Sequence, residues 1–239
     1  MFLLMPLCLA LTCPPEFASA AAVPAAEIPA GYRLLYEQNF AAPAALGDFE
    51  FSDPAAWRWT AEAGGRPGAL ELFQQSRYTP RVRSPFNIAL LAGREFGDFV
   101  LEVDLVQTGR EYGHRDMVIV FAAKDPANFY YAHLATKADD HAHNIFLVND
   151  EPRRKIADTT TDGVNWGLEV WHTVRVERRV EAGSIKVFFD DLTTPIMTAN
   201  DRHFDYGRIG FGSFDDTGKV ARIRIWGPDF APRRAGFFR

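Results

Sequence analysis

The sequence contains little cysteine, no excess of basic charge and few long apolar runs, and each of these shortages excludes some classes of protein. Of its 239 residues only two are cysteines, Cys8 and Cys13. Both lie near the N-terminus, so a chain that has lost this region forms no disulfide and carries no thiol chemistry. The formal net charge of -5 gives no electrostatic reason to expect nucleic acid or an anionic membrane as a partner.

Residues 1–20 are interpreted as a secretory signal peptide. They form a short apolar run that ends in Ala18-Ser19-Ala20, a small-x-small sequence typical of a cleavage site. Prolines break the run too early for a membrane span, so none is expected. Cys13 is a candidate lipid acceptor, although the residues before it make a poor lipobox. We therefore expect a secreted or periplasmic protein, with residues 21–31, rich in alanine and proline, as a disordered lead-in.

No segment carries a sustained helical stripe, a repeat or a heptad, whereas period-two alternation of apolar and polar residues recurs along the chain. The stretch from Trp171 to Trp226 shows it four times, which is typical of strands with one buried face. The four segments are residues 174–177, 185–189, 209–211 and 221–225. Turn composition at residues 181–184 predicts a hairpin between the first two of these strands.

About a dozen short strands of this kind are expected, many of them spaced by roughly 8–12 residues. Residues 117–122 are nearly continuously apolar, which is typical of a strand covered on both faces. The pattern predicts an all-β fold, a two-sheet antiparallel jelly-roll sandwich, because an immunoglobulin fold uses only 7–9 strands in about 100 residues. We expect a single jelly-roll domain over residues 32–230 and a C-terminal tail at residues 231–239.

Five segments in succession resemble the concanavalin-A-like lectin/glucanase superfamily. They are GDFVLEVDL, WHTVRVERR, SIKVFFDD, GRIGFGSFDD and ARIRIW, and the resemblance covers about Tyr32 to Gly227. Within the superfamily the chain is most similar to laminin-G-like bacterial domains and to the 3-keto-disaccharide hydrolase family. The resemblance implies a hydrolase of modified sugars, although the fold hosts lectins, hydrolases and lyases alike. It also implies that sandwich loops can bind calcium through oxygen ligands, with Asp215-Asp216 as one candidate; no other cofactor is expected.

Polar and aromatic residues gather in the middle of the chain. Four of the six histidines fall between residues 114 and 143. Phe129, Tyr131 and His133 share a strand face by period two, and neighbouring strands place Asp116 on or beside that face. Aromatic rings stack on the C–H faces of sugars and charged fork-shaped groups bind hydroxyls, so this band favours a saccharide cradle. The alternative is the solvated face of a β-sandwich with incidental ion pairs.

Residues in and near this band are assigned roles. The predicted catalytic residues are His133, His141, Tyr131 and Arg115: a histidine as general base, Tyr131 as acid or base, and Arg115 stabilising developing negative charge. The predicted substrate-binding residues are His114, Asp116, His143, Asn144, Arg153, Lys155 and Trp166, the last as an exposed stacking platform. No transition-metal site is predicted, because the Asp- and His-rich run at residues 139–143 has no Glu-x-x-His or cysteine pair to support it.

The segment from Glu102 to Gln107 resembles the Glu-x-Asp-x-x-Glu strand of retaining glucanases, in which two glutamates act as nucleophile and acid. Gln107 has no carboxylic acid, so we interpret the match as non-catalytic. Trp171 and Trp226 are interpreted as core or rim residues. No Gly-x-Ser-x-Gly elbow and no phosphate-cradling glycine loop occurs. The sequence thus predicts a secreted carbohydrate-active domain with a glycan or sugar ligand. Three alternatives stay open: a glycoside hydrolase, a non-catalytic carbohydrate-binding module, and a polysaccharide lyase with a His/Tyr/Arg site.

Overall fold

The structure is a computed structural model that describes residues 27–62, 65–233 and 236–238. The expected signal peptide, most of the expected lead-in and both cysteines lie outside these residues. Strands dominate the described chain, and its helices are two short 3₁₀ turns, η1 (Pro43–Asp48) and η2 (Pro54–Ala56). Among the described residues, no helix has the length and apolar character that a membrane crossing requires.

The strands are short and follow one another closely along the chain. Those of the first half are β1 (Arg33–Gln38), β2 (Phe49–Phe51), β3 (Trp57–Ala61), β4 (Gly68–Leu72), β5 (Asn87–Leu91), β6 (Arg94–Glu95), β7 (Phe99–Gln107), β8 (Asp116–Asp125) and β9 (Asn128–Ala135). Those of the second half are β10 (Asn144–Asn149), β11 (Arg154–Lys155), β12 (Ala157–Thr160), β13 (His172–Arg179), β14 (Ser184–Phe189), β15 (Met197–Asn200), β16 (Arg208–Ser213), β17 (Gly218–Gly227) and β18 (Ala231–Pro232).

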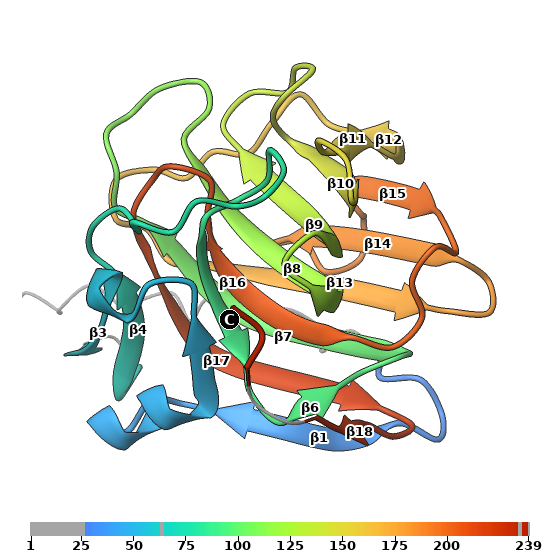
Figure 1. Cartoon of the computed structure of the whole chain (residues 1–239), viewed down its shortest axis with the longest axis horizontal. Coiled ribbons are helices and arrows are strands. Elements are labelled where there is room, and N and C mark those ends of the chain that lie inside the picture. The colour runs from blue at the N-terminus through green and yellow to red at the C-terminus, as the bar shows by residue number, and fades with distance from the viewer. Residues whose placement is uncertain (1–26, 63–64, 234–235, 239) are drawn as a thin grey trace, which may run out of the picture.

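Two antiparallel sheets form the layers of the molecule (Figure 1). Sheet A has nine strands in the order β12-β15-β14-β13-β7-β17-β4-β3, with β1 paired to β17. Sheet B has seven strands in the order β11-β10-β9-β8-β16-β5-β2. The hairpin predicted at residues 181–184 is present, because β13 pairs with β14 and Arg179 lies opposite Ser184. The prediction of an all-β two-sheet jelly-roll sandwich is confirmed.

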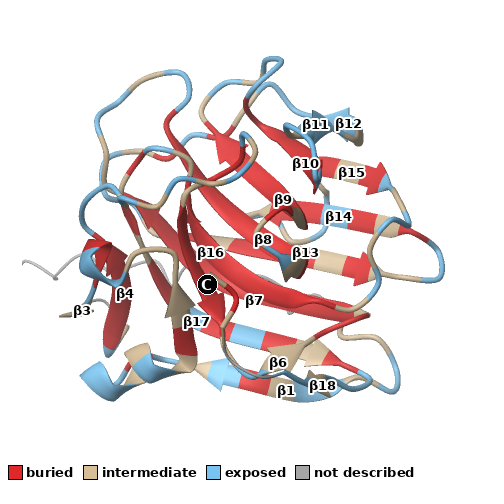
Figure 2. Ribbon diagram, in the orientation of Figure 1, coloured by how far each residue is buried: buried red, intermediate tan, exposed pale blue. Residues whose placement is uncertain are grey.

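The main core lies between the two sheets and follows from the period-two alternation. On β7, Phe99, Leu101 and Leu105 are buried in this core, while Glu102 and Asp104 point to the other face of sheet A. Figure 2 shows that buried residues line the strands and that exposed residues gather in the loops. Each fully buried aliphatic or aromatic side chain contributes about 1.5–3 kcal/mol of transfer free energy, so the core supplies the driving force for folding.

Sheet B carries a second apolar cluster on its outer face. The members of the second cluster include Val118, Val120, Phe129, Tyr131, Phe146, Val148 and, from the C-terminal end, Phe237. The backbone N–H groups of Gly236 and Phe237 donate to Glu50 Oε2 at 2.7 and 2.9 Å. The end of the chain therefore lies against this face (Figure 1), and β8 is covered on both sides, as its apolar sequence predicts.

Candidate functional site

The residues predicted to form a saccharide cradle come together only in part. Because β8 and β9 are neighbours, Asp116, Tyr131 and His133 do share one face of sheet B. That face is not open: the Tyr131 ring stacks on Phe146 at 5.1 Å between centroids, and His133 is 3% exposed. The apolar side chains around them have to be covered, and the protein's own residues cover them. The predicted cradle is therefore corrected to a packed polar and aromatic cluster.

Arg153 lies over this cluster from outside. Its guanidinium carbon is 4.2 Å from the centroid of the Phe214 ring, and its Nη1 donates to Tyr131 Oη at 3.0 Å. Burial raises the pKa of Tyr131, so its phenol is a neutral hydrogen-bonding group. Tyr131 is fully buried, so a ligand contacts it only if the covering side chains move.

Two further predicted site residues support the interior. Arg115 is buried and donates to Gln107 and, at 2.7 Å, to the carbonyl oxygen of Gly167. Trp166 is 1% exposed, and its Nε1 donates to the carbonyl oxygen of Leu134 at 3.1 Å. The expectation that Trp166 is an exposed stacking platform is therefore wrong, because its ring packs in the main core against His172 and Phe189.

His143 and Asn144 are also buried. His143 Nε2 lies 3.0 Å from Thr161 Oγ1, and burial lowers the pKa of this imidazole to about 4. Asn144 Oδ1 accepts a hydrogen bond from the backbone N–H of Ala157 at 3.1 Å. Both side chains therefore tie β10 to the segment that follows it rather than facing solvent.

The remaining predicted residues lie at the surface near the 136–143 loop. His114 pairs with Asp139, and Lys155 Nζ lies 2.6 Å from Asp140 Oδ1. His141 is exposed, and its backbone N–H donates to Asp139 at 2.7 Å. Solvated pairs of this kind contribute little to stability and match the alternative interpretation of incidental surface ion pairs. Roles for these residues in catalysis or binding stay predictions.

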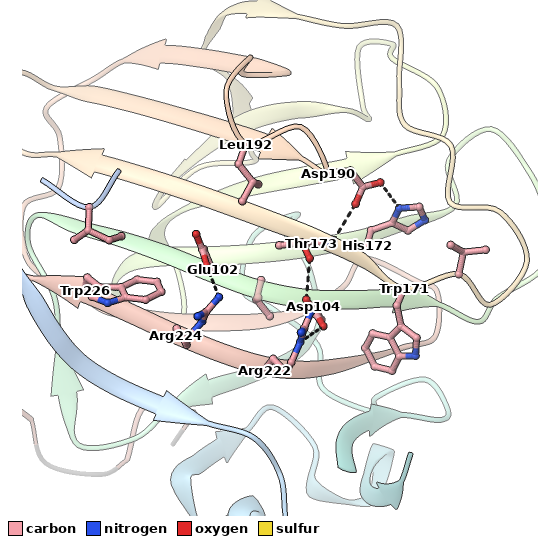
Figure 3. Close-up of a pocket in the computed structure, with 13 residues that line it drawn as sticks. Glu102, Asp104, Trp171, His172, Thr173, Asp190, Leu192, Arg222, Arg224 and Trp226 are labelled. Atoms are coloured by element: carbon pink, nitrogen blue, oxygen red, sulfur yellow. Dashed lines mark hydrogen bonds and ion pairs between the residues drawn. The ribbon is translucent and has the colours of Figure 1, made fainter. Parts of the chain in front are cut away.

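A cavity of about 600 Å³ lies on the outer face of sheet A, the sheet opposite the predicted cradle (Figure 3). We call it the sheet A groove. Its polar lining residues are Glu102, Asp104, His172, Thr173, Asp190, Arg222 and Arg224, and its apolar ones are Ile28, Val103, Val170, Trp171, Leu192 and Trp226. A mixed lining of this size is typical of a small-ligand site.

Strands β7 and β13 build the floor of the groove. Their antiparallel register places Arg175 opposite Glu102 and Thr173 opposite Asp104. Arg175 Nη2 donates to Glu102 Oε1 at 2.7 Å, and Thr173 Oγ1 donates to Asp104 Oδ1 at 3.0 Å. The same alternation that buries the apolar residues of β7 thus sets its two carboxylates side by side on the outer face.

Strand β17 adds two arginines through a β-bulge. Between Ala221 and Arg224 its register with β7 shifts, and Arg222 has a φ of 44°. A non-glycine residue in this region is costly and persists where its surroundings fix it, as happens at functional sites. The bulge brings Arg222 to Asp104, while Arg224 Nη2 donates to Glu102 Oε2 at 2.7 Å.

Each floor carboxylate is therefore held between two guanidinium groups. Glu102 pairs with Arg175 and Arg224, and Asp104 pairs with Arg222 and with Arg66, whose Nη2 is 2.6 Å away. An ion-paired carboxylate carries no proton to donate, so neither acts as a general acid in this state. The floor is a fixed set of hydrogen-bond donors and acceptors.

Two tryptophans stand at opposite ends of the groove (Figure 3). The Arg224 guanidinium lies 5.1 Å from the Trp226 ring centroid, and that of Arg66 lies 4.6 Å from the Trp171 ring. These cation–π contacts fix both rings while leaving them partly exposed. Of the two interpretations of these residues, as core or as rim residues, the second is correct, because both lie at the rim of the groove.

His172 fixes one wall of the groove. Its Nδ1 donates to Asp190 Oδ2 at 2.7 Å and its Nε2 donates to the carbonyl oxygen of Trp166 at 3.1 Å. Both partners are acceptors, so the ring holds both protons as an imidazolium. Burial acts to lower the pKa of His172, but these hydrogen bonds outweigh it and raise the pKa above its ordinary value. His172 thus orients the half-exposed Asp190 and has no nitrogen left to serve as a general base.

Residues able to hold a metal ion lie elsewhere. Among the described residues, the acidic group with metal-binding spacing consists of Asp116, Asp215 and Asp216. None of the three lines the sheet A groove.

Sequence reasoning missed the groove although a signal for it was present. Glu102 and Asp104 share one face of a strand, and Arg222, Arg224 and Trp226 are spaced in the same way on another. One strand thus carries acidic residues at every second position, and the other carries arginines at every second position followed by a tryptophan. Such a pattern indicates a charged sheet surface with an aromatic edge.

The fold and the groove together define a two-sheet jelly roll with a charged, tryptophan-flanked depression on one sheet. No protein-family model and no curated protein sequence matches the chain. Solved structures match it at the level of the fold.

Three of these structures illustrate the likeness. The chain is similar to the carbohydrate-binding module CBM66 from Bacillus subtilis, with a TM-score of 0.51 and 17% identity, covering 74% of this chain and 93% of that one. It is similar to lectin II from Ulex europaeus, with a TM-score of 0.50 and 12% identity over 80% and 96% of the two chains. For the GH43 protein BlXynB from Bacillus licheniformis the TM-score is 0.53 at 9% identity, over 82% of this chain and 39% of that one. The likeness establishes a shared jelly-roll sandwich fold.

Proposed function

We propose that the protein is a secreted or periplasmic carbohydrate-binding module whose glycan ligand lies in the sheet A groove. The observation that carries this proposal is the floor, where half-exposed Arg222 and Arg224 alternate with Glu102 and Asp104 between two tryptophans. Arginine and carboxylate groups form paired hydrogen bonds with neighbouring hydroxyls, and indole rings pack against the C–H faces of sugars. Sugars present both kinds of surface at once.

Binding fits this groove better than hydrolysis. A glycosidase that follows the usual mechanism needs a protonated carboxylic acid beside a second carboxylate. Glu102 and Asp104 are each ion-paired with two arginines, and His172 has both nitrogens engaged. Gln107, at the place of the second glutamate of a glucanase strand, is buried and bonded to Arg115 outside the groove.

Hydrolysis of a glycoside, including the reaction of 3-keto-disaccharide hydrolases, and elimination by a lyase are the competing proposals. Both rest on the sequence resemblance and on His133, His141, Tyr131 and Arg115. Solved structures that share the fold include a GH43 protein, matched over 39% of its length, as well as a binding module and a lectin. An enzyme that uses His133 and Tyr131 can bind its substrate only if the side chains that cover this face of sheet B move away. Binding in the sheet A groove requires no such movement.

A glycan array followed by calorimetric titration tests the proposal. We expect the protein to bind at least one oligosaccharide, and Trp226→Ala and Trp171→Ala each to weaken that binding about tenfold, as loss of a central aromatic contact does. Phe73→Ala is the matched control, because Phe73 is an exposed aromatic residue outside the groove.

The outcomes separate the alternatives. Unchanged affinity in both tryptophan variants rejects the groove as the binding site. New reducing ends, or unsaturated products that absorb in the ultraviolet, released from the bound glycan by the wild-type protein would establish an enzyme. Binding without product, lost in the tryptophan variants and kept in the control, supports the module.

A further inference from the structure

The positive and negative groups of the sheet A groove differ in how accessible they are. The side chains of Arg222 and Arg224 are 50% and 47% exposed. Their partners Asp104 and Glu102 are covered, with side chains that are 3% and 10% exposed. A ligand that enters the groove on the β17 side therefore meets guanidinium groups before it meets carboxylates.

Both guanidinium groups keep hydrogen-bond donors for a ligand. A guanidinium has five N–H groups. Within the part of the chain that the structure describes, Arg222 uses its Nε and Arg224 uses its Nη2, each to bind the carboxylate with which it pairs. The other N–H groups of the two side chains are available to acceptors in the groove.

These donors are also held in position. The Arg224 guanidinium lies 5.1 Å from the centroid of the Trp226 ring, and Arg222 is placed by the β-bulge of β17. Donors that the protein has already fixed lose less side-chain entropy when a ligand binds, so they contribute more to affinity than mobile ones do.

The groove carries opposite charges on its two sides (Figure 3). Arg222 and Arg224 lie on β17, whereas the half-exposed Asp190 lies across the groove, directly after β14, where His172 orients it. A ligand carboxylate is attracted by the arginines and repelled by Asp190, while a ligand hydroxyl can donate a hydrogen bond to Asp190. A sugar with a carboxylate on one side and hydroxyls on the other matches this arrangement.

One exposed acidic residue lies near the arginines but outside the groove. Glu37 on β1 is opposite Arg224, and β1 pairs with the edge of β17 that faces away from β7. Glu37 lines a separate depression of about 290 Å³ there, whereas the groove lies over β7 and β13. It therefore leaves the groove side of the arginines open to an anionic ligand.

We propose that the glycan bound in the sheet A groove is acidic, and that Arg222 and Arg224 bind the carboxylate of one of its uronic acid residues. This inference rests on the proposed function and narrows it to a chemical class. The planar fork of a guanidinium matches a carboxylate in paired, charge-assisted hydrogen bonds, which are about twice as strong as neutral ones. The Trp226 ring beside Arg224 packs against the C–H face of the same sugar.

Calorimetric titration with matched pairs of trisaccharides tests the proposal. The probes are the trisaccharides of galacturonic, glucuronic and mannuronic acid, each compared with its methyl ester, which has the same sugar and linkage but no charge. We expect at least one acid to bind about tenfold more tightly than its ester, the value of one hydrogen bond to a charged group. Salt should reduce this preference, because it screens charges at a half-exposed site.

Variants of the two arginines locate the carboxylate. We expect Arg222→Gln and Arg224→Gln each to remove most of the preference for the acid over the ester. Arg224→Lys keeps the charge but loses the fork, so it should keep only part of the preference. Arg202→Gln is the control, because Arg202 is an exposed arginine outside the groove, and it should keep the full preference. The ratio of the two affinities within one variant does not depend on how much of that variant is folded.

Three results would overturn the proposal. In the first, every ester binds as tightly as its acid. In the second, Arg222→Gln and Arg224→Gln keep the same preference as Arg202→Gln. In the third, a sulfated trisaccharide binds more tightly than every uronic acid probe, which would assign the arginines to a sulfate. A neutral oligosaccharide whose binding is lost in Trp171→Ala and Trp226→Ala would reject the acidic class alone and leave the proposed function standing.

Discussion

Replacing Glu102 with glutamine removes one negative charge from the floor of the sheet A groove and keeps the size of the side chain. In the native protein, Glu102 Oε1 accepts a hydrogen bond from Arg175 Nη2 and Glu102 Oε2 accepts one from Arg224 Nη2, each at 2.7 Å. The Arg175 side chain is 2% exposed, whereas that of Arg224 is 47% exposed and can turn to water. The substitution therefore leaves a buried guanidinium short of negative charge and affects the exposed one little.

We expect Glu102→Gln to lower the free energy of unfolding by about 3 kcal/mol, the lower end of the range for breaking a buried ion pair. The lower end applies because Glu177 Oε1 stays 3.2 Å from Arg175 Nη1. Urea unfolding at pH 7 measures the loss as a shift in midpoint at constant slope. Glu181→Gln, at an exposed position, is the control and should stay within about 0.5 kcal/mol of the wild type.

A double variant separates charge from packing. Glu102→Leu combined with Arg175→Met removes both buried charges, and we expect it to be more stable than Glu102→Gln, because an apolar pair of similar volume replaces a desolvated ion pair at little cost. A Glu102→Gln protein as stable as the Glu181→Gln control would refute the view that the floor is a desolvated ion-pair network.

Three further predictions concern stability and protonation. Burial lowers the pKa of His143 to about 4 from its usual 6.5, so the unfolded chain binds the extra proton and stability falls as pH drops through that window. This pH-dependent part of the free energy of unfolding, about 3 kcal/mol, should be absent in His143→Asn when unfolding by urea is measured at several pH values. A His143→Asn protein whose stability depends on pH as steeply as that of the wild type would contradict the prediction. Folding raises the pKa of His172. Its contribution to stability is therefore fully present at pH values below the pKa in the unfolded chain, and it is lost as the pH rises through the higher pKa in the folded chain. An NMR titration should show this raised pKa, lowered in Asp190→Asn; equal values in both proteins would oppose it. Phe237→Ala should cost about 3 kcal/mol in urea unfolding, because the ring packs on sheet B; no loss would mean that this end of the chain does not cover the face.

The strands could be predicted from the sequence because alternation is a local property. The four segments in which alternation predicts strands, residues 174–177, 185–189, 209–211 and 221–225, lie within β13, β14, β16 and β17. Strand β15 (Met197–Asn200) is only four residues long, too short to show a clear alternation. It forms by pairing with β14 and β12, and pairing partners are not encoded locally.

The sequence signals a polar face with an aromatic edge on sheet A, but the position of the site depends on contacts between residues that are distant in the sequence. Period two sorts residues between the two faces of a strand, but it does not say which face of the sheet is covered. Sheet B is covered by Phe214 and Phe237, which come far later in the chain than His133. The groove on sheet A depends on the bulge at Arg222, which no residue type marks.

Mapping amide and indole shifts by NMR while a bound oligosaccharide is added tests the central claim most directly. We expect the indole N–H signals of Trp171 and Trp226 and the amide signals of Arg222 and Arg224 to move in a saturable way. Shifts confined to His114, His141 and Lys155, with both indole signals unchanged, would place the ligand at the predicted polar band and contradict binding in the sheet A groove.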